Sequence, residues 1–335
     1  VRAGSCAPWV HHGRLAAVGP RASSYADGVT DAAALLPTQR ALTEAELAAV
    51  LAPLGRVTDH WLLSGGTFSA VQGAELQDGA TVVVKTSVPE ATGPDGRTRL
   101  LAYERDLLRA ERDNLALVAG LATVPAPRVL HADFTRAHTE VDVLVMSLVP
   151  GMPWDAATDV MTPAANAHAF AQVGAILAAL GTVRGPAFGL PADGFALGDA
   201  TWQGFVRRLV AATVDDAVAW DVDVEAGRLE AAVDACAEAL AEVTEPTLVH
   251  ADLWHGNVLV DPQTGDVTGV VDFERSLFGD PLWGFAGGET HASGPFEQSK
   301  VRGFEAATGR PLVMGDAARR RVALYRLWSM AVQLI

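Results

Sequence analysis

Residues 248–274 constrain the fold and the chemistry of this chain more than any other segment. They place His250, Asp252 and Asn257 in the pattern H-x-D-x-x-x-x-N, and Asp272 follows after an Asp-Pro-Gln-Thr-Gly turn and a short apolar strand. A loop and a hairpin of this length bring these polar side chains to one place. Phosphoryl transfer from ATP uses such a set, because one carboxylate receives the hydroxyl proton while an amide and a second carboxylate hold Mg²⁺.

Part of this pattern also occurs elsewhere in the chain without the rest. His131-Ala132-Asp133 repeats the His-Ala-Asp triplet, but His138 stands where the asparagine would be. A buried structural hairpin with polar ends is therefore the alternative interpretation of residues 248–274. The complete pattern, with the asparagine and the second aspartate in place, favours the catalytic interpretation.

Charge and composition exclude several classes of partner and location. The 335 residues include 25 Lys and Arg against 40 Asp and Glu, a net charge of −15. Nucleic acids and anionic membranes need a basic surface, so we expect neither as a general partner. No apolar run reaches the ~18–20 residues that span a bilayer, and His11, His12 and Arg14 interrupt any stretch that resembles a signal peptide. Cys6 and Cys236 are too few for a disulfide framework, which suits a reducing cytoplasm.

Composition divides the chain into three parts. Residues 1–40 are rich in Gly, Ala, Ser and Pro without periodicity, and we expect a disordered leader there. Residues 41–149 mix strand and helix patterns, whereas alanine-rich helical patterns dominate residues 150–335. The last of these patterns has no cap, so its helix is expected to continue beyond Ile335. This order predicts an α+β chain with an N-terminal lobe, a mainly helical C-terminal lobe and a cleft between them.

Periodicity also predicts individual elements. Thr43 and Glu46 form a capping box that opens a short helix. An antiparallel sheet with a long helix beside it is expected in the N-terminal lobe. The predicted strands cover 57–63, 70–76, 81–85, 129–132 and 141–145, and the predicted helices cover 99–121, 163–181, 200–219, 226–243 and 295 to the chain end.

Lys85 ends the third predicted strand, where its ammonium group could reach the phosphates of ATP. A lysine at a strand end is more often a solvated surface residue, and one that binds phosphate usually needs a helix glutamate to orient it. Glu111 on the predicted helix at 99–121 is the expected partner, and Glu104, two turns earlier, is the alternative. Either glutamate could instead be an ordinary exposed charge.

Two backbone segments are candidates for nucleotide binding. Ser64-Gly65-Gly66-Thr67-Phe68-Ser69 joins two predicted strands, and its N–H groups with the Ser64, Thr67 and Ser69 hydroxyls could cover phosphates. After the strand at 141–145, the C=O of Ser147 and the N–H of Val149 could bind the adenine edge. An ordinary hairpin and a plain buried strand are the alternatives. The glycine loop is neither G-x-G-x-x-G nor a Walker A sequence, which disfavours protein kinases and P-loop enzymes.

With these residues placed, the chain resembles the aminoglycoside phosphotransferase family over roughly residues 57–330. The resemblance is strongest in HADLWHGNVLV, in VVDFE and in the following Gly279-Asp280-Pro281. It implies a two-lobed protein-kinase-like fold, and an enzyme that moves the γ-phosphate of ATP or GTP to a hydroxyl of a small molecule. It also implies structural roles for His250, which would support the catalytic loop, and for Asp280, which would cap the segment after the motif.

The same resemblance implies a catalytic role for each motif residue. Asp252 would be the catalytic base, and Asn257 and Asp272 would bind Mg²⁺. Lys85 would hold the α- and β-phosphates and pair with Glu111. A nucleotide-binding pseudoenzyme is the alternative from a different functional class, and the presence of the full residue set argues against it.

The acceptor is less constrained than the chemistry. Carboxylates that could bind a poly-amine sugar form a cluster around Trp220 and follow the motif: Asp215, Asp216, Asp221, Asp223, Glu225, Glu274 and Glu289. A solvated acidic helix end is the commoner arrangement of such residues. An aminoglycoside antibiotic is the leading acceptor, which would give antibiotic resistance, and a sugar or amino alcohol is the next. The bulky Trp254-His255 pair could narrow the acceptor site. The sequence leaves the oligomeric state open.

Overall fold

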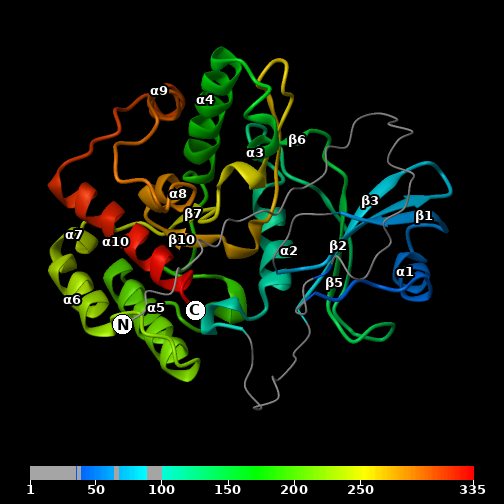
Figure 1. Ribbon diagram of the computed structural model, residues 1–335, viewed down its shortest axis with the longest axis horizontal. Helices are drawn as coiled ribbons and strands as arrows, with labels where there is room; N and C mark the ends of the chain where they lie inside the picture. The colour runs from blue at the N-terminus through cyan, green and yellow to red at the C-terminus, as the bar shows by residue number, and fades with distance from the viewer. Residues whose placement is uncertain (1–34, 36–38, 64–67, 89–99) are drawn as a thin grey trace, which may run out of the picture.

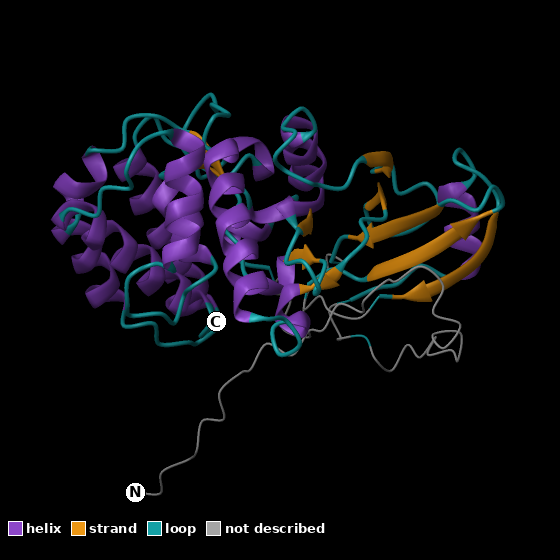
Figure 2. Cartoon of the chain, turned by 90° about the horizontal axis from the view of Figure 1, so that it is seen from above, coloured by secondary structure: helices purple, strands orange, loops and turns teal. Residues whose placement is uncertain are grey.

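The computed structural model describes residues 35, 39–63, 68–88 and 100–335. Most of the expected leader at 1–40, and the Ser64-Gly65-Gly66-Thr67 part of the glycine loop, lie outside the described residues. The longer strands gather at one end of the molecule together with α1 (Glu44–Leu51), and most of the other helices lie at the other end (Figures 1 and 2). The antiparallel sheet and the mainly helical remainder that the sequence predicts are confirmed.

The N-terminal sheet has the strand order β1-β2-β3-β5-β4, with each neighbouring pair antiparallel. Its strands are β1 (Val57–Leu62), β2 (Val71–Leu76), β3 (Thr81–Thr86), β4 (Val129–Asp133) and β5 (Val143–Ser147). β3 carries consecutive valines before Lys85, and β-branched residues favour strands. Because β3 lies in the middle of the order, Lys85 pairs with Val71 on one side and with Leu144 on the other.

Alternate residues of these strands pack into two different cores, as the strand repeat requires. Val84 and Val145 pack with α1 (Glu44–Leu51) on one side of the sheet. The Thr43–Glu46 capping box that begins α1 is confirmed. Leu144, the next residue along β5, belongs to the second core with the rest of the molecule. Lys85 is the cross-strand partner of Leu144, so its side chain is on this second side.

The helix expected at 99–121 is shorter than predicted. Ala102–Glu104 form a separate 3₁₀ turn, η2, and Asp106 has a left-handed backbone with φ of 53°. A left-handed residue without glycine's freedom interrupts a helix, so α2 covers only Leu107–Val118. Residue 99 lies outside the described residues, and the prediction is wrong for the stretch between it and Leu107.

Helices dominate the chain after β5. They are α3 (Trp154–Ala157), α4 (Pro163–Leu180), α5 (Trp202–Ala219), α6 (Ala226–Ala235), α7 (Ala237–Ala241), α8 (Pro281–Gly287), α9 (Gln298–Thr308) and α10 (Asp316–Val332), with a 3₁₀ turn, η3, at Ala192–Phe195. The single helices expected at 226–243 and from 295 onwards are each divided, the second by Gly309, which closes α9 with φ of 67°. α8 was not predicted. Asp280 caps it by accepting a hydrogen bond from the Leu282 N–H at 3.0 Å, the role that the resemblance implies.

The segment with the H-x-D-x-x-x-x-N pattern leads into a small hairpin within the helical part. β8 (Val258–Val260) pairs with β9 (Val267–Val270) and with β6 (Met152–Pro153), while β7 (Thr247–Val249) pairs with β10 (Leu277–Gly279). The expected turn is present, and its Gly265 N–H donates to the Asp261 carbonyl at 2.8 Å. The 3₁₀ turns η4 (His255–Asn257) and η5 (Phe273–Arg275) lie at the two open ends of the hairpin. A hydrogen bond from the Val271 N–H to the Asn257 carbonyl, at 3.0 Å, holds these ends together.

None of the helices in the described part of the chain has the length and apolar character needed to cross a membrane.

Candidate active site

The loop between β7 and β8 is built around a fully buried histidine. His250 Nε2 lies 2.9 Å from the carbonyl oxygen of Val271, and because a carbonyl only accepts, Nε2 carries the proton. The ring of Phe273 lies edge-on to the imidazole, with centroids 4.6 Å apart. Burial lowers the pKa of His250 to about 4, so the ring is neutral near pH 7. His250 thus joins the strand before the loop to the segment after the hairpin, which is the contact that a supporting role requires.

Asp252 and Asn257 are joined by hydrogen bonds across the loop. The Asn257 amide nitrogen donates to the Asp252 carbonyl at 2.8 Å and to the Asp252 carboxylate at 3.2 Å. Its amide oxygen accepts no hydrogen bond from the described residues. Ala251 and Asp272 both have left-handed backbones, with φ of 62° and 64°. Such strained residues cluster at functional sites, where the surrounding structure holds them in place.

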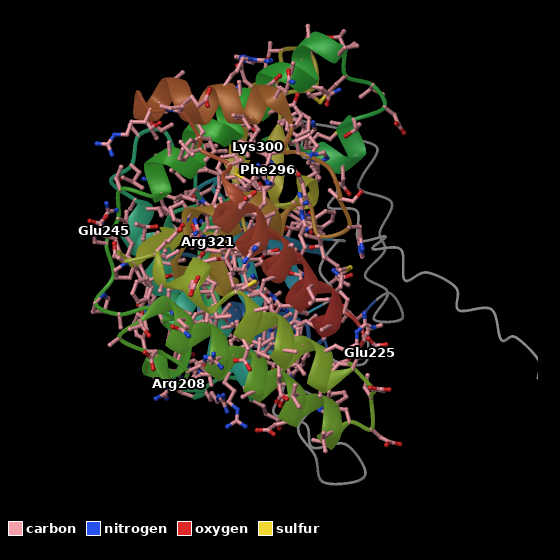
Figure 3. All side chains as sticks on the ribbon, turned by 90° about the vertical axis from the view of Figure 1, so that its left-hand side faces the viewer. Arg208, Glu225, Glu245, Phe296, Lys300 and Arg321 are labelled. Carbon is pink, nitrogen blue, oxygen red and sulfur yellow. The ribbon has the colours of Figure 1, made fainter. Side chains whose placement is uncertain are left out.

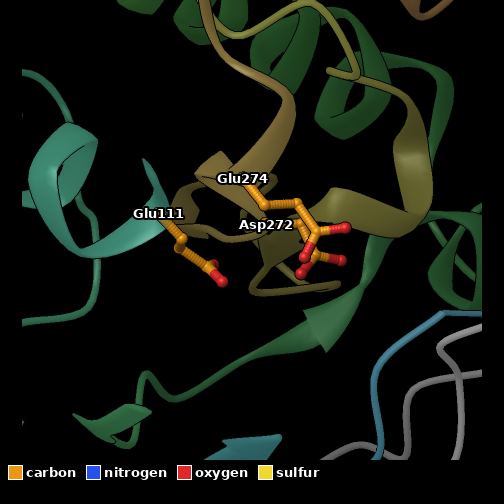
Figure 4. Close-up of side chains that lie close together, drawn as sticks. All are labelled: Glu111, Asp272 and Glu274. Atoms are coloured by element: carbon orange, nitrogen blue, oxygen red, sulfur yellow. The ribbon is translucent and has the colours of Figure 1, made fainter. Parts of the chain in front are cut away.

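Lys85 lies at the centre of three carboxylates. Its Nζ is 2.8 Å from Glu111 Oε2, 2.5 Å from Asp272 Oδ1 and 2.8 Å from Glu274 Oε2. Glu111 points from α2 toward Asp272 and Glu274, which come from the end of the hairpin and from η5 (Figure 4). Oxygen atoms of the three carboxylates all lie within 4.8 Å of one another. The structure therefore brings the predicted Lys85, Glu111 and Asp272 together, and adds Glu274.

Burial and charge compete in this cluster. Burial alone would lower the pKa of Lys85, but Asp272, Glu111 and Glu274 raise it well above its ordinary value, so the ammonium is charged. Burial raises the pKa of Glu111, and Lys85 opposes that rise. Burial would also raise the pKa of Asp272, but the charge and the hydrogen bond of Lys85, together with other neighbours that include Arg275, lower it below its ordinary value. Burial raises the pKa of Asp252 to about 7; Arg275 opposes this rise, and Asp272 and Glu274 add to it.

The alternative partner of Lys85 has a different contact. Glu104 binds Arg275, with Nη2 2.9 Å from Oε1, and it also accepts the Leu101 N–H at 3.0 Å. Arg275 donates in addition to the Tyr103 hydroxyl at 2.7 Å, and its guanidinium lies 4.9 Å from the ring centroid of Phe68, the residue after the undescribed part of the glycine loop. Arg275 was not singled out from the sequence. Its position directly after the D-F-E triplet was the one available signal.

These side chains line one large cavity. Its volume is about 680 Å³, and most of the predicted site residues contribute to its wall. We call one part the sheet end, defined by Ser69, Lys85, Glu111, Ser147, Val149, Asp252, Asn257 and Asp272. We call the other part the helical end, which comes from α5, α8 and α10 and is defined by Leu209, Trp220, Trp283, Trp328, Ser329 and Val332. The Ser69 carbonyl accepts a hydrogen bond from Gln39 at 3.1 Å. Ser64, Gly65, Gly66 and Thr67 cannot be placed relative to this wall because they lie outside the described residues.

The carboxylates suggested for the acceptor do not gather in the cavity. Glu274 is engaged by Lys85, and Glu289 pairs with Lys300 and with Arg326. The Trp220 cluster is spread over the surface. Asp216 accepts a hydrogen bond from the Ala102 N–H, and Asp223 accepts one from the Glu225 N–H. The Glu225 side chain pairs with Arg228. Four members of the cluster do not line the cavity: Asp215, Asp221, Asp223 and Glu225. Figure 3 shows Glu225 at the rim of the molecule, away from Lys300 and Phe296. The residues that define the helical end include no carboxylate, and Glu104 and Glu274, which line the cavity elsewhere, are paired with Arg275 and Lys85.

The donor set at the sheet end fits Mg²⁺. Asp272 offers a carboxylate whose side chain is 36% exposed, and Asn257 offers an amide oxygen that accepts no hydrogen bond within the described part of the chain. Mg²⁺ prefers hard oxygen ligands and usually takes one or two from the protein, with phosphate and water as the others. The two side chains supply such a pair beside Asp252 and Lys85.

Comparison with known proteins gives a matching family and a curated relative. The model of the phosphotransferase enzyme family matches residues 77–324. A stretch of 174 residues is 30% identical to the Escherichia coli (strain K12) protein named "Probable ketoamine kinase YniA", covering 48% of this chain and 54% of that protein. The chain thus spans about half the length of this curated relative.

Two solved structures have a similar fold. One is a thermostable mutant of aminoglycoside phosphotransferase APH(4)-Ia in complex with AMP-PNP and hygromycin B, with a TM-score of 0.58, 21% identity, and coverage of 87% of this chain and 90% of that one. The other is a "putative fructosamine-3-kinase" from Thermobifida fusca, with a TM-score of 0.57, 21% identity, and coverage of 87% and 100%. These likenesses confirm the two-lobed protein-kinase-like fold. Because the family model matches most of its length, the chain belongs to the phosphotransferase enzyme family, as its resemblance to the aminoglycoside phosphotransferases predicted.

Proposed function

We propose that this protein transfers the γ-phosphate of ATP, with Mg²⁺, to a hydroxyl group of a small sugar-like molecule. The observation that carries the proposal is the convergence of Asp252, Asn257, Asp272 and Lys85 on one cavity. The family match and the nucleotide analogue in the APH(4)-Ia complex support it.

Asp252 is the proposed catalytic base. It accepts the proton of the acceptor hydroxyl as that oxygen attacks the γ-phosphorus, and the bond from the γ-phosphorus to the bridging oxygen of ADP breaks. The raised pKa of Asp252, about 7, suits this role, because a base is most effective when its pKa is near the working pH. The hydrogen bonds from Asn257 hold its carboxylate in one orientation.

The nucleotide is proposed to occupy the sheet end of the cavity. Lys85, oriented by Glu111, would bind the α- and β-phosphates, and the backbone of Ser147 and Val149 would bind the adenine edge. The glycine loop at 64–69 would cover the phosphates. Asn257 and Asp272 would hold Mg²⁺, which neutralises the charge that develops on the phosphates. GTP would use much of this set, so both nucleotides belong in the assay.

The acceptor is proposed to occupy the helical end. A poly-amine would need free carboxylates there, and the residues that define this end offer aromatic faces instead. Aromatic side chains bind ring-shaped molecules through their faces and exclude water. A ketoamine or another sugar derivative with few charges therefore fits this end better than an aminoglycoside with many. The ketoamine kinase named among the relatives is in keeping with this choice.

The test is ADP release from Mg-ATP or Mg-GTP against a panel that pairs ketoamines and neutral glycosides with aminoglycosides. Acceptor-dependent release that disappears in Asp252→Asn would support the transfer reaction. Tight Mg-ATP binding without any acceptor-dependent release would favour a nucleotide-binding pseudoenzyme. Preferred turnover of a polycationic aminoglycoside would keep the reaction but reject the acceptor class.

A further inference from the structure

The three carboxylates around Lys85 differ in how far they are exposed to the cavity. The Asp272 side chain is 36% exposed, whereas those of Glu111 and Glu274 are 1% and 8% exposed. A metal or phosphate group that enters the cavity can reach Asp272 most easily. Glu111 and Glu274 are placed to remain on the lysine when Asp272 is drawn away from it.

The two buried glutamates come from different parts of the fold. Glu111 is on α2, which packs beside the sheet, and Glu274 is on η5, which follows the β8–β9 hairpin; the loop that carries Asp252 precedes the same hairpin. A second contact joins the same two elements, because the Asn114 amide on α2 donates to the Phe273 carbonyl on η5 at 2.9 Å. If Asp272 turns toward a metal ion, the Lys85–Glu274 ion pair remains. It still joins Lys85 on the sheet directly to the segment that follows the hairpin.

The charges in the cluster do not balance. Lys85 faces three carboxylates whose oxygens are within 4.8 Å of one another. The nearest second cation, Arg275, lies 3.9 Å from Glu274 but also pairs with Glu104, so two cations face four carboxylates. Like charges at this separation repel in a buried environment. An arrangement that served stability alone would not need a third carboxylate here, and functional sites often carry such a cost.

We propose that Glu274 is a second positioning residue for Lys85, one that fixes the lysine relative to the catalytic hairpin when Asp272 leaves it for the metal-bound nucleotide. The inference rests on the proposed function. It assigns Glu274 to nucleotide binding, in place of the acceptor binding expected from the sequence.

Glu274→Gln tests this assignment, because it removes the charge and keeps the shape of the side chain. We expect the Kd for Mg-ATP, measured by calorimetry, to rise about tenfold, since a charge-assisted contact that orients the phosphate-binding group is lost. The affinity for adenosine should stay the same, because adenosine has no phosphate for Lys85 to bind. The melting temperature without nucleotide should be unchanged or higher, because one of the repelling charges has gone.

A matched control is Glu289→Gln. Glu289 also pairs with a buried lysine, Lys300, which lies 5.6 Å from the ring centroid of Phe296 (Figure 3), but neither Glu289 nor Lys300 lines the cavity. This variant should leave Mg-ATP affinity unchanged and should lower the melting temperature, because it leaves a buried ammonium with less compensation.

Three results for Glu274→Gln would overturn the inference. Equal losses of Mg-ATP and adenosine affinity, with a lower melting temperature, would mark a purely structural residue. An increased Mg²⁺ requirement at unchanged ATP affinity would mark a metal ligand. Unchanged affinity for Mg-ATP would exclude any role in positioning. If the wild-type chain bound no Mg-ATP, the proposed function would fall first, and the inference with it.

Discussion

The two ends of the cavity are lined by different kinds of side chain. The sheet end contains a buried lysine and several carboxylates, of which Asp272 has a left-handed backbone, and its charged groups contact one another directly. The helical end contains tryptophans and aliphatic side chains from α5, α8 and α10. The first arrangement suits an anionic ligand with a metal, and the second suits an uncharged body whose shape is recognised by packing.

The same difference would place the phosphoryl-transfer chemistry at the sheet end and the choice of acceptor at the helical end. Groups that move a phosphoryl group must be held in fixed geometry, and the pairs at the sheet end provide this. The choice of acceptor depends on the shape of the cavity surface, so substitutions at the helical end need not slow phosphoryl transfer. Variants at the two ends should therefore have different kinetic signatures, and the following predictions test that separation.

The greatest effect is expected for Asp252→Asn. The substitution removes the proton acceptor but keeps an oxygen and a similar volume, so kcat should fall about 10²–10⁴-fold while Mg-ATP affinity changes little. Steady-state kinetics with an identified acceptor and calorimetry with Mg-ATP would measure both. A loss of less than about tenfold in kcat would reject Asp252 as the base.

Asp272→Ala should act on the nucleotide alone. Because the carboxylate is proposed to hold the metal that bridges to phosphate, Mg-ATP should bind about tenfold or more weakly, while adenosine binds as before. Titration of both ligands by calorimetry, with and without Mg²⁺, provides the measurement. Similar losses for the two ligands would show that the variant had damaged the pocket instead of the metal site.

The two ends also differ in how well the sequence predicts them. The proximity of Asp252, Asn257 and Asp272 could be predicted because their spacing in a short loop and hairpin fixes their positions. Glu274 was only one of several candidates for acceptor binding, since sequence spacing does not reveal that η5 turns it onto Lys85.

The helical end could not be predicted from spacing at all. Leu209, Trp283 and Trp328 lie on α5, α8 and α10, and they meet only through the packing of these helices. The start of α2 was missed for a local reason, because the left-handed backbone at Asp106 has no signature in the pattern of apolar residues. Contiguous motifs were therefore predictable, and long-range packing was not.

A moderate effect is expected from Trp220→Leu at the helical end. Trp220 follows α5, is half-buried and lines the cavity. Loss of its aromatic face should raise the KM for the acceptor several-fold while the KM for Mg-ATP and kcat stay near their wild-type values, because a contact made equally in ground and transition states is lost. The unchanged Mg-ATP value is the internal control. An equal rise in both KM values would mean that the two ends are not separate.

The smallest effect is expected from the double variant Asp221→Asn with Asp223→Asn. Both residues are exposed and neither lines the cavity, and the Asp223 carboxylate accepts the Glu225 N–H at 2.8 Å. Charges of this kind act only through solvent, where salt screens them over ~8 Å at physiological ionic strength. The acceptor KM should therefore change less than about twofold at 0.15 M salt. Inhibition by an aminoglycoside, used as a competing polycation, should be equally insensitive. If instead the double variant raised the KM several-fold, and if the effect disappeared at high salt, the acidic cluster would be part of the acceptor site. The acceptor would then be cationic, and the contrast between a charged sheet end and an uncharged helical end would no longer hold.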